Sequence, residues 1–329
     1  MKSEIVGIRS TQVLESSVQR AVERFHHDVL QPDLALVVFF CAPELDRHAV
    51  AAAMRQHFPG VPVVGCWSTG VLGPLGCTSG GLAGLSFSSR HFSATTLVFD
   101  DLAQTGMDEA RAAVRRAQLG LPQEAGRGQF GFLMVDGVPE REEPVARALQ
   151  AALGDVPLVG GSVGHAPPLA APALFAEGRL VERGAVLALI STTLPLRPMM
   201  AQHFLPQAQR LVVTAADAER RLVFEIDGLP AAEAYAAAVG VATSALDEAV
   251  FAATPLAVLI GGTSYVRSIG DVRPDGALKF FCAVEEGMVL RPMRPGDLAG
   301  QLRDSFAKLC GDIGPPALVL ACECFLRRT

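Results

Sequence analysis

Val61-Pro62-Val63-Val64-Gly65-Cys66 recurs as Val156-Pro157-Leu158-Val159-Gly160-Gly161, 95 residues further along the chain. The match extends backwards without a gap, so that 35–66 aligns with 130–161. In both copies an apolar run typical of a strand comes first, and apolar residues at helical spacing follow it. We therefore predict that each copy folds as a strand, a helix and a short strand that ends in glycines. A repeat of this size is typical of a duplicated supersecondary unit.

The composition narrows the class of protein. The 329 residues are 50% hydrophobic, with a mean hydropathy of +0.32 and a net charge of −6. No apolar run approaches the roughly 20 residues of a membrane helix, and the N-terminus lacks a signal-peptide core. We expect a cytoplasmic protein with a large core and an apolar subunit interface, as in a homodimer. The absence of basic runs argues against nucleic acid and membrane as partners. The odd number of cysteines, seven, favours reduced thiols.

The pattern of predicted elements favours an α/β (α+β) fold, with duplicated strand-helix-strand units in mixed sheets and a strand-rich C-terminal domain. We expect a first domain over 1–210, with its two repeats at about 33–99 and 128–193. The second domain covers 211–329. Asp275-Gly276 between two short strands is a strong hairpin signal there. We expect this domain to be mainly antiparallel and to complete the sheet system of the first.

Catalytic motifs are missing from the sequence: it has no nucleophile elbow, phosphate-binding loop or zinc-protease signature. Cys322 and Cys324, with Cys310 upstream, could form a thiolate metal site, but zinc sites rarely separate cysteines by a single residue. A final strand predicted over 317–322 would instead place both thiols on one face, as small core residues.

The glycine turns are the candidate ligand site. Glycine at the end of a buried strand lets the backbone approach a ligand, or a packed neighbour, closely, and these two interpretations are equally supported. Asp136 follows the first strand of the second copy, where it is either a ligand group or part of a solvated loop. The candidate ligand-binding residues are Gly65, Cys66, Ser68, Asp136, Gly160, Gly161, Ser162 and His165.

Two histidines are the best placed to reach a cleft shared by the two glycine turns. His165 follows the second glycine turn, and His203 follows the next predicted strand. Imidazole is the usual axial ligand of haem iron. A lone histidine in apolar surroundings is more often a packed side chain than a metal ligand.

The repeated phrase resembles the FIST N-terminal domain, and the last third of the chain resembles the FIST C-terminal domain. The segments that carry the second resemblance are 225–233, 265–269, Asp275-Gly276 and 286–290. Within the family, Gln202-His203-Phe204 is similar to the NosP-type members. The resemblance implies a signal-input protein that binds a small ligand, with haem as the cofactor for nitric-oxide sensing and His203 as the ligand of its iron. It also implies a histidine kinase or a cyclic-di-GMP enzyme as the signalling partner, and no catalytic activity.

The sequence departs from the family pattern at two points. The second turn continues as Gly164-His165, where the family has glycine followed by an acid. The chain ends soon after Cys324, so we expect a short C-terminal domain whose missing terminal strand either exposes a sheet edge or opens the cleft. Two other classes of function stay open. One is an enzyme on an α/β scaffold that uses Asp136, His165 or a cysteine, and the other is a structural subunit of a signalling complex.

Overall fold

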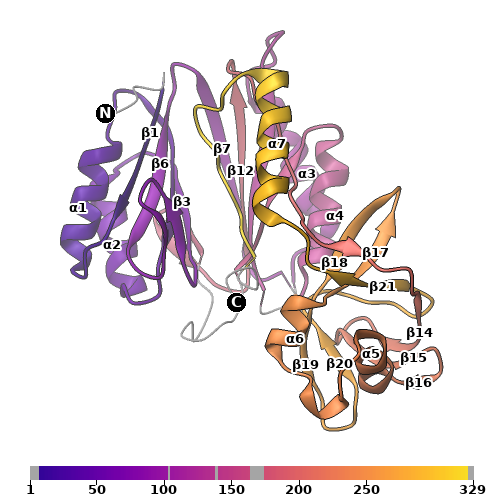
Figure 1. Cartoon of the computed structure of the whole chain (residues 1–329). Coiled ribbons are helices and arrows are strands. Elements are labelled where there is room, and N and C mark those ends of the chain that lie inside the picture. The colour runs from indigo at the N-terminus through magenta and orange to yellow at the C-terminus, as the bar shows by residue number, and fades with distance from the viewer. Residues whose placement is uncertain (1–6, 103, 138–139, 164–173, 325–329) are drawn as a thin grey trace. The chain divides into compact units, whose positions relative to one another are not determined.

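The computed structural model describes residues 7–102, 104–137, 140–163 and 174–324. These residues divide into two compact units (Figure 1). Unit 1 contains the described residues up to Pro198, together with Pro315–Glu323. Unit 2 contains Met199–Gly314 and Cys324. The chain therefore passes from unit 1 to unit 2 and returns to unit 1 near its end.

The first copy of the repeat forms sheet 1 and the two helices on it. Its second helix begins at an aspartate cap, since Asp46 accepts a hydrogen bond of 2.8 Å from the N–H of Ala49. The strands lie in the order β1-β6-β2-β3, with β2 and β3 parallel and the other pairs antiparallel. The elements are β1 (Ile8–Val13), α1 (Val18–Val29), β2 (Leu34–Cys41), α2 (Arg47–His57), β3 (Val63–Trp67), β4 (Val71–Gly73), β5 (Gly76–Thr78) and β6 (Leu82–Ser88).

The second copy repeats this topology in sheet 2. Its strand order is β7-β12-β8-β9, and again only the last pair is parallel. The predicted duplication is therefore confirmed. The elements are β7 (Phe92–Phe99), α3 (Met107–Gly120), β8 (Gly128–Asp136), α4 (Glu142–Leu153), β9 (Leu158–Val163), β10 (Leu174–Ala176), β11 (Arg179–Val181) and β12 (Ala185–Thr192).

In strands β2 and β8, the gapless alignment of the two copies is wrong by one residue. The N–H of Val37 donates to the carbonyl of Pro62, whereas in the second copy Gly131 donates to Pro157. The prolines are 95 positions apart but the donors only 94, so the second copy has one extra residue between strand and helix. A slip of one residue in a strand exchanges its two faces. Accordingly, Val37 packs beneath the helices, whereas Phe132, its gapless partner, packs between the sheets.

Unit 1 is a four-layer α-β-β-α sandwich. Helices α1 and α2 cover the outer face of sheet 1, and α3 and α4 cover the outer face of sheet 2 (Figure 1). The inner faces of the two sheets share one apolar core, which we call the inter-sheet core. It includes Val38, Cys66 and Leu85 from sheet 1, and Met134 and Val186 from sheet 2. Alternate residues of each central strand thus supply the two faces.

A hairpin of the second copy completes the sheet of the first. Strand β10 pairs with β3, Leu174 opposite Cys66 and Phe175 opposite Gly65, and β11 follows at the edge. In the described part of the chain, the equivalent hairpin of the first copy, β4–β5, forms a two-stranded sheet of its own. Strand β9, the counterpart of β3, therefore lies at the edge of sheet 2 among the described residues.

Unit 2 has its own antiparallel sheet around a separate core. A mainly antiparallel, strand-rich region is confirmed, but the expectation that it completes the earlier sheets is wrong. Tyr235 is fully buried in this core, and its hydroxyl donates to the carbonyl of Thr254. The elements are β13 (Leu205–Pro206), β14 (Leu211–Asp217), β15 (Leu222–Ile226), β16 (Leu229–Pro230), α5 (Ala231–Val239), a 3₁₀ turn (Thr243–Ala245), α6 (Glu248–Ala253), β17 (Leu256–Ile260), β18 (Thr263–Arg267), β19 (Ile269–Val272), β20 (Leu278–Phe280), β21 (Val289–Arg294) and α7 (Leu298–Ile313).

The final strand predicted over 317–322 is not formed. These residues follow α7 without strand pairing. Pro315 and Pro316 stand at the start of the segment, and Pro316 cannot supply the N–H donor that regular pairing requires. Among the described residues, no helix is both long and apolar enough to cross a membrane.

Candidate functional site

The first glycine turn is closely packed. Gly65 lies in β3 above the ring of Phe39, and a Cβ at this position would come within 2.5 Å of that ring. The Phe39 ring is fixed in turn by an edge contact with Trp67. Packing beneath the helices therefore accounts for the glycine. The next residue, Cys66, points the other way into the inter-sheet core and is 6% exposed.

The polar residues predicted beside these turns serve the backbone. The N–H of Ser68 donates to the carbonyl of Cys41, a bond of 2.8 Å that continues from β3 towards the end of β2. Asp136 is 2% exposed, and its carboxylate accepts a hydrogen bond from the N–H of Arg183. Its own N–H donates to the carbonyl of Gly184. Asp136 thus fastens the turn that leads into β12.

The second glycine turn is open. Gly160, Gly161 and Ser162 are exposed on the edge strand β9. Gly160 has a φ of +143°, and a Cβ there would lie 1.9 Å from the carbonyl oxygen of Leu133, so this position requires glycine. Gly161 is different, because the nearest atom to its Cβ position is the Cβ of Cys322, 4.0 Å away. Close packing and a positive φ therefore require glycine at position 160, whereas neither applies at position 161.

Cys322 connects the two turns. It lies beside Gly161, and it is also close enough to Cys66 to act on the ionisation of that thiol. Burial, and secondly the neighbouring Cys322, raise the pKa of Cys66 to about 12. Burial also raises the pKa of Cys41, well above its ordinary value. Both thiols therefore stay protonated at neutral pH, which makes them weak nucleophiles and weak metal ligands. Among the described residues, no cluster of three or more ligating side chains could hold a metal ion.

Sequence reasoning treated Cys322 and Cys324 as core residues, and this interpretation is wrong, because both are exposed. The proximity of Cys322 to Gly161 was also missed. The available signal was the alternation of leucine with shorter apolar residues from Ala317 to Ala321, which is typical of an extended segment with one face on a core.

Of the two histidines proposed as haem ligands, the structure describes His203 but not His165. His165 lies outside the described residues. His203 lies in unit 2, in a segment before β13, and its ring is 4.2 Å from that of Phe204 between centroids. The His203 carbonyl oxygen would be 2.5 Å from a Cβ at Gly296, so the backbone here is closely packed.

Haem requires a broad apolar slot on the ligand side of its imidazole. The His203 ring lies over Phe204, and the adjacent Leu205 is 43% exposed. Neither of the two hollows described below includes His203. The described residues therefore fit a packed imidazole better than an iron ligand.

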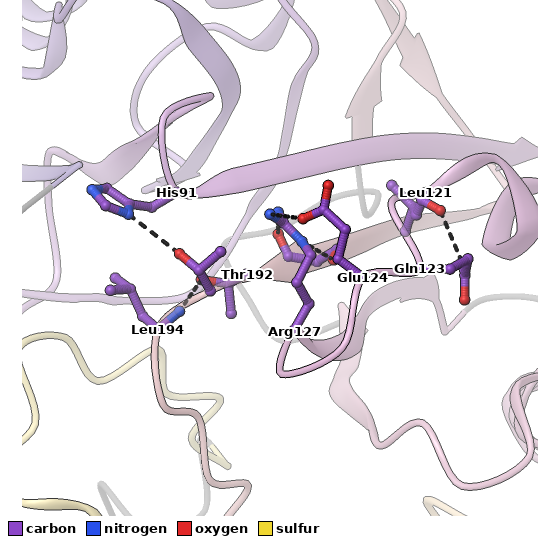
Figure 2. Close-up of polar contacts among 9 residues, drawn as sticks. His91, Leu121, Gln123, Glu124, Arg127, Thr192 and Leu194 are labelled. Carbon is purple, nitrogen blue, oxygen red and sulfur yellow. Dashed lines mark hydrogen bonds and ion pairs between the residues drawn. The ribbon is translucent and has the colours of Figure 1, made fainter.

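A polar hollow of about 440 Å³ lies at the opposite ends of β8 and β9, where these strands begin. Arg127 is one of its lining residues, and Figure 2 shows the polar contacts of this side chain. The guanidinium donates to the hydroxyl and the carbonyl of the buried Ser191 and lies 3.6 Å from the carboxylate of Glu124. Sequence reasoning did not single out this residue. The available signal was the loop 122–127, which is longer than its counterpart 31–33 in the first copy.

A second hollow of similar volume lies between α2 and the β10–β11 hairpin. Arg55 donates to the carbonyl of Gly178 there, and Arg179 makes a two-point ion pair with Asp100, each bond 2.8 Å long. That pairing lowers the pKa of Asp100, mainly through the hydrogen bond from the guanidinium. These cations hold the crossing hairpin in place.

Fold and site together define a duplicated α/β sandwich whose candidate site offers an exposed strand edge, a hydroxyl and protonated thiols. The FIST N domain matches residues 35–229, and the FIST C domain matches residues 231–329. The chain belongs to the FIST family, whose domains are small-ligand sensory domains of signalling proteins. A comparison with curated proteins finds no match.

Proposed function

We propose that this protein is a non-enzymatic sensor whose small ligand binds at the carboxyl ends of β3 and β9. The observation that supports this most is the convergence of Cys66 and Gly161 on Cys322. Cys66 and Gly161 hold the same place in the repeated phrase, so the duplication brings two equivalent strand ends to one neighbourhood. Ligands of α/β sheets gather at such carboxyl ends.

The groups at this place suit recognition better than catalysis. Gly160, Gly161 and Ser162 present backbone N–H and C=O groups and one hydroxyl on an exposed edge. The floor beside them is apolar, because Cys66 and Val163 belong to the inter-sheet core. A ligand with a hydrogen-bonding end and a short apolar part would match this combination.

The regulated partner is a signalling enzyme, either a histidine kinase or a cyclic-di-GMP enzyme. Binding would alter the signal only if the ligand prefers one of two conformations of the sensor. Cytoplasmic location and a homodimeric state belong to the same proposal. Co-purification of the tagged chain with a kinase or a cyclic-di-GMP enzyme from its own cells would test the partner class.

The ligand is tested by thermal unfolding of the purified chain with a panel of amino acids, short carboxylates, nucleosides and haemin. A panel compound that binds the folded state raises the unfolding midpoint, and the rise grows with the logarithm of its concentration once that exceeds Kd. The Ser162→Ala variant should lose most of that shift, because the exposed hydroxyl on β9 is removed. The matched control is Ser89→Ala, which removes an exposed hydroxyl from the turn between β6 and β7. Equal shifts in both variants would contradict the proposed site.

Haem binding through His203 stays a prediction, and the absorption spectrum of the protein tests it separately. Reconstitution with haemin should give a Soret band if an imidazole holds the iron. The band should then disappear in His203→Ala and persist in His165→Ala. The reverse pattern would assign the iron to His165, and a band that survives both changes would exclude both residues.

A further inference from the structure

A segment of the chain itself lies beside the exposed edge of β9. The sequence equivalent of Cys66 on β3 is Gly161 on β9. Leu174 of the crossing hairpin lies opposite Cys66, and Cys322 lies beside Gly161 with 4.0 Å to its Cβ position. The segment 315–323, which we call the strap, thus approaches β9 where β10 approaches β3.

The strap is docked by alternate side chains. Leu318 and Leu320 pack against the inter-sheet core that contains Cys66, whereas Val319 between them is 51% exposed. Ala317 and Ala321 are also exposed. This period of two is that of an extended chain with one face on a core. No strand pairing is assigned to the strap among the described residues, so two half-buried leucines carry much of the contact.

The strap has a covalent connection that suits it for relaying a change. It begins immediately after α7, which ends at Gly314 with a left-handed φ of +82°. The strap belongs to unit 1, and α7 belongs to unit 2. The chain also passes between the units after Pro198. A displacement of the strap therefore pulls directly on the last helix of unit 2.

We propose that the strap is a displaceable cover of the ligand site at β3 and β9, and that ligand binding and strap docking exclude one another. This inference rests on the proposed function, since it names the regulation of the same site. The segment that covers the edge of β9 is the strap, residues 315–323 of this chain. Release of the strap on ligand binding would change the pull on α7 and so inform unit 2.

The docking of the strap is tested without any ligand, by the reactivity of Cys66. Native full-length protein is treated with N-ethylmaleimide, and the labelled fraction of each cysteine is followed by peptide mass spectrometry. Leu320→Asp should accelerate labelling of Cys66 about tenfold, because the lost burial of a leucine is of the size that changes an equilibrium by that factor. Val319→Asp is the matched control, since its side chain already points to solvent, and should leave the rate unchanged.

Cys41 is the internal control in the same samples. It is buried on the helix face of sheet 1, away from the inter-sheet core. If Leu320→Asp accelerates Cys41 and Cys66 equally, the variant opens the whole of unit 1 and the strap is not a local cover. Equal labelling of Cys66 in Leu320→Asp and Val319→Asp would overturn the docking directly.

A disulfide lock tests the coupling to the ligand. The Gly161→Cys variant would place a Cβ 4.0 Å from that of Cys322, within the range of a disulfide. Cys77 and Cys324, which are exposed, are replaced by serine. Diamide then removes one hydrogen from each of the two thiols as the bond forms. The locked strap should abolish the midpoint shift given by the panel compound, and dithiothreitol should restore it.

The outcomes separate this inference from the proposed function. A panel without any binder, together with selective labelling of Cys66, supports the strap and contradicts the ligand site. A compound that stabilises the locked and the reduced protein equally, with a shift that Ser162→Ala removes, supports the ligand site and overturns the strap as its cover.

Discussion

Asp136 and Arg183 are joined by a hydrogen bond from the Arg183 N–H to the buried carboxylate of Asp136. The first copy makes a comparable bond of 2.6 Å, from the N–H of Gly81 to the carboxylate of Glu44. Adjacent backbone bonds are equivalent, since Ala42 donates to Gly81 and Asp136 donates to Gly184. Each copy thus uses an acidic side chain, at the end of β8 or shortly after β2, to hold the turn into β12 or β6.

Burial sets the expected cost of removing these two carboxylates. Asp136→Ala should reduce the free energy of unfolding by about 1–3 kcal/mol, because it removes the buried acceptor of the hydrogen bond from the Arg183 N–H. Asp136→Asn keeps an acceptor oxygen and should cost less. Glu44→Ala is the matched comparison at an exposed position and should cost under about 1 kcal/mol. Urea unfolding of the three variants measures this order, and an equal loss in all three would refute it.

The two neighbouring glycines of β9 should respond very differently to alanine. Gly160→Ala forces a Cβ against the Leu133 carbonyl and a side chain onto a φ of +143°, so we expect a loss above about 3 kcal/mol or no folded protein. Among the described residues, the Cβ of Gly161→Ala meets Cys322 alone, at van der Waals distance, and the change should alter stability by less than about 0.5 kcal/mol. The expression level and the thermal unfolding midpoint of the two variants test this difference in stability. Similar midpoints would show that the backbone of β9 relaxes.

Acid should destabilise unit 1 through His26. Burial, followed by the positive charges of His57 and His27, lowers the pKa of His26 below 6.5. The unfolded chain therefore binds a proton more readily, so this contribution to stability is present above about pH 6.5 and is lost as the pH falls. His57→Gln removes one repulsion and should flatten the dependence of the midpoint between about pH 5 and 7. An unchanged slope would exclude this pair as its source, and His27→Gln is the exposed comparison.

Arg127 is expected to stabilise through Ser191 and not through Glu124. Arg127→Ala removes two hydrogen bonds to the buried Ser191, for a cost of about 1–3 kcal/mol. Glu124→Gln removes the charge of the Glu124 side chain, which is 74% exposed. An ion pair at such a position contributes at most about 1 kcal/mol to stability. Chemical unfolding with and without 0.5 M salt (roughly a 4 Å screening length) separates the two. A salt-sensitive loss in Arg127→Ala would contradict this assignment.

In unit 2, the Tyr235 hydroxyl is a measurable anchor. Burial raises its pKa to about 12, while its bond to Thr254 acts in the opposite direction. Tyr235→Phe should cost about 1 kcal/mol, because the Thr254 carbonyl loses a donor. Absorbance titration should show the Tyr235 phenol ionising at a higher pH in the native protein than in the urea-unfolded chain. Ionisation of Tyr235 at the same pH in both states would show that the side chain is not buried.

The duplicated strand-helix-strand units could be predicted because apolar periodicity and glycine turns are local signals. The extra residue before α4 could not, because a slip of one residue is visible only when strands are paired. Likewise, nothing in residues 174–181 indicates that they pair with β3, since that contact joins distant parts of the chain. For the site, the sequence supplied Cys66, Gly161 and Ser162, and their places on β3 and β9 agree with its pattern. It failed for Cys322, because a segment that packs in an extended conformation without strand pairing among the described residues resembles a strand in sequence.

The crossing of β10–β11 onto β3 has a consequence for the origin of the fold. A protein with a single copy would have had no second hairpin in its own chain to cover β3. Two such molecules could have covered each other by exchanging hairpins, as in a swapped dimer. In the present chain the hairpin β10–β11 of the second copy covers β3, whereas among the described residues β4–β5 of the first copy pairs with no strand of sheet 2. The halves of unit 1 are for this reason not separable modules, and a chain cut before residue 128 would expose β3 as an aggregation-prone edge.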